Sequence, residues 1–110
     1  MEVFEAIAQP RRREIMRLLA AGELSAGSIA ARFSITQPAI SQHLKVLKES
    51  GLVGERREGT RRLYSIRPEG LAELHTFLRE LVPDGLGRLK RAAEAEERER
   101  TAHAPESRSN

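Results

Sequence analysis

The chain has 110 residues, of which 39% are hydrophobic and 32% charged, a composition typical of one soluble domain with a strongly ionised surface. It has no cysteine, which excludes disulfides, thiol nucleophiles and thiolate metal sites. The formal net charge of +3 is a mild basic bias that is compatible with a nucleic-acid partner.

The first half of the chain predicts four short helices. Apolar residues at helical spacing begin at Phe4, and Pro10 suits the first turn of a second helix. A third helix is expected to begin near Ser25, a candidate N-cap. The fourth is expected over residues 36–50, with Thr36 as its N-cap and Gly51 favouring a left-handed conformation after its end.

After residue 51 the apolar period changes from helical to alternating, which predicts a β-hairpin over residues 52–66 around a turn at 58–60. A helix restarts after Pro68. We expect the folded domain to span residues 1–82, followed by a C-terminal helix over 83–100. Residues 101–110 contain no large apolar side chain and are predicted to be a disordered tail.

The fourth predicted helix is amphipathic. At about 100° per residue, Ile40, Leu44 and Leu47 share one face, with His43 on the same half. The opposite half is polar and carries Gln37, Ser41, Lys45 and Lys48, with Gln42 to one side. A solvated helix surface is the simplest interpretation, but these donors and acceptors are also the types that reach base edges and phosphates. A short helix, a three-residue connection and this helix together form a helix-turn-helix, which indicates DNA binding.

Positive charge is concentrated around the predicted hairpin. Residues 1–82 hold 13 basic and 10 acidic side chains, whereas residues 83–110 hold 6 of each. Within residues 45–67 there are 7 basic and 3 acidic side chains. A charged edge hairpin can simply prevent aggregation, but this one directly follows the helix that is expected to contact DNA, and nearby phosphate would relieve its repulsion.

Four segments resemble the ArsR/SmtB-type winged helix-turn-helix transcriptional regulators. They are Ala8-Gln9-Pro10-Arg11-Arg12-Arg13-Glu14-Ile15, Thr36-Gln37-Pro38-Ala39-Ile40-Ser41-Gln42-His43-Leu44-Lys45-Val46-Leu47, Gly51-Leu52-Val53 and Arg57-Glu58-Gly59-Thr60-Arg61-Arg62-Leu63-Tyr64-Ser65-Ile66. The resemblance covers about residues 4–81. It implies a mainly α fold with a small β-hairpin wing (α+β), which dimerises through its N- and C-terminal helices.

The resemblance and the helical pattern together predict a DNA-binding surface. We expect base edges to be read by Gln37, Ser41 and Gln42. Phosphates are expected to be held by Lys45 and Lys48, and the wing to contribute Arg57, Arg61 and Arg62. Pro38 and His43 complete the expected DNA-binding set; His43 suits a partly buried role from its face of the helix, and the resemblance implies a position close to the DNA backbone.

Apolar side chains near both ends of the domain are more numerous than so small a core requires. They are Phe4, Ile7, Leu71, Leu74, Leu78, Leu81, Leu86 and Leu89. We expect them to form a two-fold interface between two copies of the chain. The alternative is that they fold back onto their own helix-turn-helix core.

Metal-sensing members of the family often carry cysteines in the helix before the recognition helix. Ser25 and Gly27 stand at those positions here, so that site cannot form. In the helix after the wing, His75 has only Glu69 and Glu73 as possible oxygen partners, too few imidazoles or thiolates for a paired transition-metal site. We therefore expect no metal and no cofactor. No nucleophile or acid–base constellation is present either, which argues against an enzyme.

The resemblance implies a homodimeric, sequence-specific transcriptional repressor, and its two-fold symmetry predicts that it binds double-stranded DNA at an inverted-repeat operator. No apolar run approaches the roughly 20 residues that span a bilayer, so we expect a cytoplasmic protein without membrane contact. Two alternatives stay open: a sensor gated by a metal or small molecule, and a winged domain that contacts protein or RNA.

Overall fold

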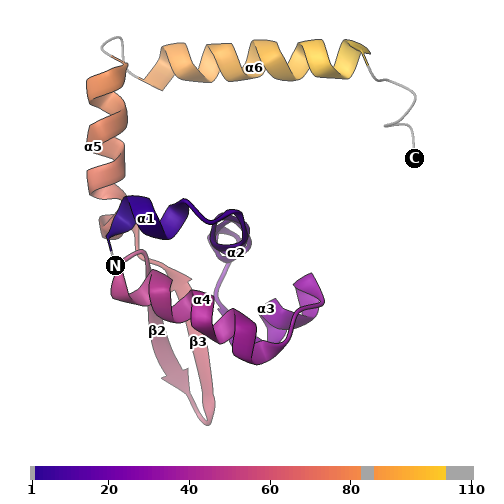
Figure 1. The fold of residues 1–110 in the computed structure, drawn as a ribbon, viewed down its shortest axis with the longest axis vertical. Coiled ribbons are helices and arrows are strands. Elements are labelled where there is room, and N and C mark those ends of the chain that lie inside the picture. The colour runs from indigo at the N-terminus through magenta and orange to yellow at the C-terminus, as the bar shows by residue number, and fades with distance from the viewer. Residues whose placement is uncertain (1, 83–85, 104–110) are drawn as a thin grey trace. The chain divides into compact units, whose positions relative to one another are not determined.

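The computed structural model describes residues 2–82 and 86–103 (Figure 1). The chain divides after Leu74 into two compact units, so the first unit ends before the boundary at residue 82 that the sequence suggested. The first unit contains α1 (Val3–Ile7), α2 (Pro10–Ala20), β1 (Leu24–Ser25), α3 (Ala26–Phe33), α4 (Gln37–Glu49), β2 (Val53–Glu58), β3 (Arg61–Ile66) and the 3-10 turn η1 (Pro68–Leu71). Helix α5 (Ala72–Leu81) begins in the first unit and continues into the second, which also contains α6 (Leu86–His103).

Local sequence signals set the starts of the helices. Pro10 is the first residue of α2, where its missing N–H leaves no hydrogen bond unmade. The Ser25 hydroxyl accepts a hydrogen bond from the backbone N–H of Ser28 at 3.2 Å, and the Thr36 hydroxyl accepts one from Ala39 at 3.3 Å. Both predicted N-caps are therefore confirmed, and the connection between α3 and α4 has the length of a helix-turn-helix.

The core of the first unit forms where α2, α3 and α4 meet the sheet. Its largest fully buried side chains are Ile15, Ile29, Ile40, Leu44, Leu47, Leu52 and Val53. Because α4 supplies three of them, its apolar face is fixed against the core and its polar face has to point outward.

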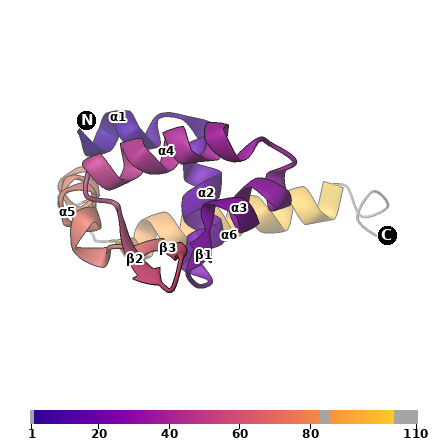
Figure 2. The same ribbon diagram turned by 90° about the horizontal axis from the view of Figure 1, so that it is seen from below.

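The predicted hairpin is confirmed, with Val53 opposite Ile66 at its base and Glu58 opposite Arg61 at its tip. Gly59, in the two-residue turn, has a φ of 65°, the left-handed conformation that such hairpin turns need. A third strand was not predicted: β1 pairs antiparallel with β3 and makes a three-stranded sheet of order β1-β3-β2 (Figure 2). Two residues are too short a run to show alternation.

The C-terminal helices differ from expectation at their ends. Helix α5 is preceded by the 3-10 turn rather than starting directly after Pro68. Helix α6 extends to His103 and therefore includes the first three residues of the segment that was expected to be a tail. The remainder of the predicted tail, 104–110, and the first residues of the predicted C-terminal helix, 83–85, lie outside the described residues.

The apolar residues that we assigned to a dimer interface fall into two groups. Ile7, Leu71 and Leu74 pack partly against the core of their own chain, as the alternative interpretation proposed, while Phe4 and Leu78 are half-buried. In contrast, the side chain of Leu81 is 62% exposed, and that of Phe77, one turn before it in α5, is 42% exposed. The side chains of the two remaining candidates, Leu86 and Leu89, lie outside the described part of the structure.

Candidate nucleic-acid interface

Helix α4 presents a polar face, as the helical wheel predicted. This face carries a polar file, the row formed by Gln37, Ser41, Lys45 and Lys48, and all four residues are exposed. Gln42, to one side of the file, and Pro38, at the start of the helix, are exposed as well. The residues opposite the file are at most 1% exposed, namely Ile40, Leu44 and Leu47. The helix therefore cannot rotate to hide its polar file without exposing the core.

The three arginines of the wing that were predicted to contact DNA are all exposed. Arg57 of β2 lies directly opposite Arg62 of β3 in the register of the sheet, and Arg61 follows the turn. Like charges directly opposite each other on neighbouring strands repel and destabilise the pair. An anion bound at the wing would reduce this repulsion.

A groove separates α4 from the wing. It consists of two hollows, of about 460 and 270 Å³, that share Ser41, Arg62 and Tyr64 in their lining. Gln37 and Arg61 line the larger hollow, whereas Lys45 lines the smaller one. The groove thus brings the predicted residues of the helix and those of the wing to the same place, although they are far apart in sequence.

Glu55 of β2 is an acidic residue of this groove that the sequence did not single out. Its Oε1 accepts a hydrogen bond from the Lys48 Nζ at 2.6 Å, and its Oε2 lies 3.6 Å from the Arg62 Nε. The hydrogen bond from Lys48 lowers the pKa of Glu55 below its ordinary value, and the charges of Lys48, Arg62 and Arg57 add to the effect. Glu55 is therefore ionised at neutral pH, and two of the predicted phosphate-binding cations already have an anionic partner.

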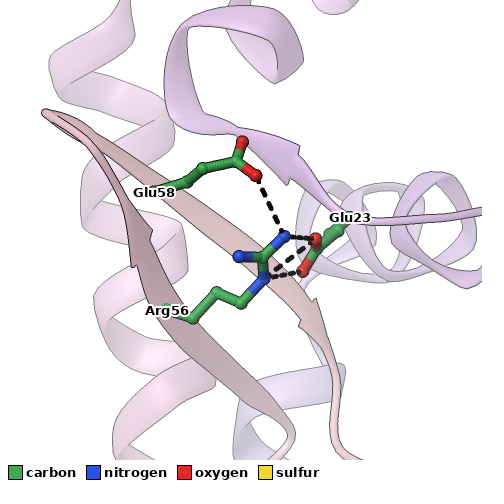
Figure 3. Close-up of polar contacts among 3 residues, drawn as sticks. All are labelled: Glu23, Arg56 and Glu58. Atoms are coloured by element: carbon green, nitrogen blue, oxygen red, sulfur yellow. Dashed lines mark hydrogen bonds and ion pairs between the residues drawn. The ribbon is translucent and has the colours of Figure 1, made fainter.

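Arg56, the neighbour of Glu55, belongs to a separate ion-pair cluster (Figure 3). Its guanidinium group donates hydrogen bonds to both carboxylate oxygens of Glu23, which precedes β1, and lies 3.6 Å from Glu58. The hydrogen bond from Arg56 lowers the pKa of Glu23. Arg56 thus links the wing to the segment before β1. It is one of the basic residues counted within 45–67, but its charge is balanced by the neighbouring Glu23 and Glu58.

The remaining basic residues of this surface form a distinct set. Among the described residues, none of Lys45, Arg57 and Arg61 forms an ion pair. Lys45 lies on the exposed face of α4, while the two arginines flank the tip of the wing. A surface with unpaired cations on two sides of a groove can hold a polyanion and would release counterions on binding it.

His43 lies at the edge of the α4 face that packs on the protein, and it is half-buried. Burial lowers the pKa of His43 below its ordinary value, and the positive charges of Arg12 and Arg11 lower it further. The imidazole is therefore neutral at pH 7. This agrees with the partly buried role expected for it, whereas its expected DNA contact stays a prediction.

The lowered pKa predicts an acid-dependent loss of stability. The unfolded chain takes up the His43 proton near pH 6.5, before the folded chain does, so the contribution of neutral His43 is complete above pH 6.5 and is lost as the pH falls from there toward the folded pKa. We expect the urea midpoint of the parent chain to decrease between pH 7.5 and pH 5.5 by more than that of His43→Gln. Equal decreases in the two proteins would contradict this assignment.

Within residues 2–82 and 86–103, no group of three or more His, Cys, Asp or Glu side chains is arranged to hold a metal ion. No helix in these same ranges is both long enough and apolar enough to cross a membrane.

The chain was compared with known proteins. Residues 9–55 match the family described as "Bacterial regulatory protein, arsR family". The HTH-type transcriptional regulator Rv2034 of Mycobacterium tuberculosis is 48% identical over 75 residues, which are 68% of this chain and 70% of that protein. The transcriptional repressor SdpR of Bacillus subtilis is 36% identical over 76% of this chain and 92% of its own length.

A solved structure gives the same result for the fold. It is the solution NMR structure of a homodimeric winged helix-turn-helix DNA-binding domain from Mycobacterium bovis, described as a possible ArsR-family transcriptional regulator. It is 38% identical to this chain, with a TM-score of 0.61, and the match covers 76% of this chain and 78% of that one. The winged helix-turn-helix fold predicted from the sequence is therefore confirmed.

Proposed function

The chain belongs to the arsR family of bacterial regulatory proteins and is a DNA-binding transcriptional regulator rather than an enzyme, and from this premise we propose that it is a homodimeric repressor of an inverted-repeat operator. Two copies would place their α4 helices about 34–36 Å apart, one turn of B-DNA. Each α4 would enter the major groove, and each wing would lie against the flanking backbone. A dimer bound in this way would block access to a promoter in the cytoplasm.

The observation that carries this proposal is the groove between α4 and the wing. The hydrogen-bonding groups of Gln37 and Ser41 line it together with Arg61 and Arg62, while Lys45 supplies a further unpaired cation. Polar groups on the helix suit base edges, and cations on both sides suit the phosphates that border a groove of DNA.

The proposed roles of the individual residues follow from their placement. Gln37, Ser41 and Gln42 read bases from the exposed face of α4. Phosphate contacts come from Lys45, Lys48, Arg57, Arg61 and Arg62, with Lys48 and Arg62 shared with Glu55. Pro38 approaches the backbone at the start of the helix, and His43 contacts it from the half-buried edge.

The proposed dimer is supported by the exposed apolar residues of α5. Leu81 and Phe77 leave much of their apolar surface in water in a single chain. A second copy would bury them, and the Mycobacterium bovis relative is homodimeric. That SdpR is named a transcriptional repressor favours repression over activation.

The experiment that tests this function compares Gln37→Ala with Arg61→Ala on duplexes selected from a random library. Gln37→Ala is expected to reduce sequence preference by about 1–3 kcal/mol without changing the dependence on salt. Arg61→Ala is expected to weaken binding to every duplex and to reduce the slope of log K against log salt by about 0.9. Fluorescence anisotropy between about 50 and 200 mM KCl measures both quantities.

A control and a contradicting outcome complete the test. Arg11→Ala removes one arginine of α2 that lies outside the lining of the groove and is paired with Glu14, and it should leave the slope close to that of the parent. If Gln37→Ala and Arg61→Ala both bound selected duplexes as the parent does, the assigned surface would be wrong.

A further inference from the structure

Glu55 is the acidic side chain in the lining of the groove that is proposed to face DNA. It lines the smaller hollow together with Lys45, Lys48 and Arg62. Its side chain is only 19% exposed, whereas those of its two partners are more than half exposed, at 53% for Lys48 and 55% for Arg62. The carboxylate thus lies toward the floor of the groove, and its cationic partners reach toward solvent.

The two ends of the groove differ in whether an acidic side chain lines them. The larger hollow is lined by Gln37, Arg61 and Arg62 and has no acidic residue in its lining. The smaller hollow contains the carboxylate of Glu55 between Lys48 and Arg62, and the unpaired Lys45 also lines it. An oxyanion of DNA that enters the larger hollow meets two arginines and no described acidic side chain, whereas one that enters the smaller hollow meets the carboxylate of Glu55 as well as the cations.

A carboxylate and a backbone phosphate compete for the same partners. Both are oxyanions that accept charge-assisted hydrogen bonds from lysine and arginine. As long as Glu55 holds Lys48 and Arg62, the three side chains together present a single net positive charge rather than two. A phosphate at this end would have to take one cation from Glu55 and remain close to the carboxylate, which repels it.

We propose that Glu55 is a specificity-determining residue that limits the affinity of this chain for DNA of any sequence by occupying Lys48 and Arg62. The inference rests on the proposed function, since it concerns the same surface. Sequence-independent binding depends on phosphate contacts, so a charge that weakens these contacts reduces it directly. Base contacts from the exposed face of α4 do not involve Glu55, so the bases must contribute a larger share of the total affinity.

A purely structural role for the same ion pairs is less consistent with the exposure of the cations. Pairs between lysine, arginine and carboxylates at an exposed surface contribute little to folding. Lys48 and Arg62 are both more than half exposed, so the cluster is open to exchange with a phosphate. Substitution by glutamine keeps the size of the side chain and its ability to accept a hydrogen bond, which makes Glu55→Gln a test of charge.

The test measures binding of the full chain to a labelled mixed-sequence duplex of about 30 base pairs, long enough for two half-sites one turn apart. Glu55→Gln is expected to bind this duplex about 3- to 10-fold more tightly near 0.1 M KCl, as expected for the loss of one charge close to a phosphate. The slope of log K against log salt should become steeper by about 0.9, the value for one additional phosphate contact.

Glu49→Gln is the matched control. Glu49 is the last residue of α4, is exposed and lies outside the lining of the groove, and its substitution changes the net charge by the same amount. We expect an affinity within about twofold of the parent, because a charge outside the groove is screened by salt. If Glu49→Gln and Glu55→Gln increased the affinity for the duplex equally, the change in net charge alone would explain the increase, and the proposal would be overturned.

A double variant distinguishes two possible roles of Glu55, which either competes with a phosphate for Lys48 or orients Lys48 toward a phosphate. Combining Lys48→Gln with Glu55→Gln removes the pair without changing the net charge, and the proposal predicts the salt slope of the parent. If Glu55 instead orients Lys48 toward a phosphate, Glu55→Gln binds more weakly than the parent and the double variant loses about 0.9 from the slope. Either result overturns the role proposed for Glu55 but leaves the proposed function intact. The proposed function itself fails if the parent shows no salt-dependent binding to DNA.

Discussion

Substitution of Gly70 by alanine is expected to destabilise the first compact unit by about 3 kcal/mol or more, the upper part of the range for overpacking. A Cβ atom at Gly70 would lie 1.9 Å from the carbonyl oxygen of Gly51 and 2.7 Å from its carbonyl carbon. Both are backbone atoms, so no side-chain rotation can relieve the overlap. The 3-10 turn Pro68–Leu71 would have to move away from the end of α4.

The segment that Gly70 contacts is itself fixed. Gly51 has a φ of 81°, a left-handed conformation that ends α4, and the next residue, Leu52, is fully buried. The carbonyl of Leu52 also accepts a hydrogen bond from the Arg67 N–H at 2.9 Å. Movement at Gly51 would therefore disturb both the core and the chain that leads to η1.

Urea unfolding followed by circular dichroism measures the effect, with Gly87→Ala as the matched control. Gly87 is an exposed residue of α6, and among the described side chains its new Cβ would meet only Arg91 Nη1, at 3.6 Å. Alanine at this helical position should have no effect or stabilise the chain by up to about 1 kcal/mol. An unfolding midpoint of Gly70→Ala equal to that of the parent would show that the two backbones do not approach as closely as described.

Substitution of Leu81 by glutamate is expected to convert the proposed dimer to a monomer and to lower operator affinity by about 100-fold or more. The side chain is 62% exposed in the single chain, so burial in a dimer would remove apolar surface from water, whereas a carboxylate there would lose its hydration. A monomer contacts one half-site and loses the gain in affinity that two linked contacts provide.

The charge that this substitution adds needs its own control. Thr76→Glu adds the same charge to an exposed residue of α5, on the side of the helix away from Leu78. Sedimentation equilibrium should give a dimer for Thr76→Glu and a monomer for Leu81→Glu, with DNA binding changed greatly only in the latter. A dimeric Leu81→Glu with parental operator affinity would exclude this part of α5 from the interface.

Features that depend on residues close together in the chain could be predicted from the sequence. The caps Ser25 and Thr36, the start of α2 at Pro10 and the buried face of α4 all rest on contacts within a few residues or on helical periodicity. The hairpin was predicted in the same way, because Gly59 marks a tight turn between two alternating segments. The winged helix-turn-helix followed from the order of these elements.

Features that depend on the packing of distant segments could not be predicted. Arg56 and Glu23 are 33 residues apart, and their ion pair forms only because β1 lies against β3. The same holds for the contact of Gly70 with Gly51, which no local pattern indicates. The number of basic residues within 45–67 gives no information on their partners. In the structure some of these cations form ion pairs, and others form none among the described residues.

Binding of DNA by α4 and the wing can be tested by an NMR titration of the labelled full chain with a duplex that it selects from a random library. If α4 and the wing hold DNA, the largest changes in amide chemical shift will occur at exposed residues of α4, such as Ser41 and Lys45, and at Arg57 and Arg61 beside the turn of the wing. Salt should reverse these changes, because phosphate contacts supply much of the affinity. Saturable shifts confined to other elements, with α4 and the wing unchanged, would contradict the account.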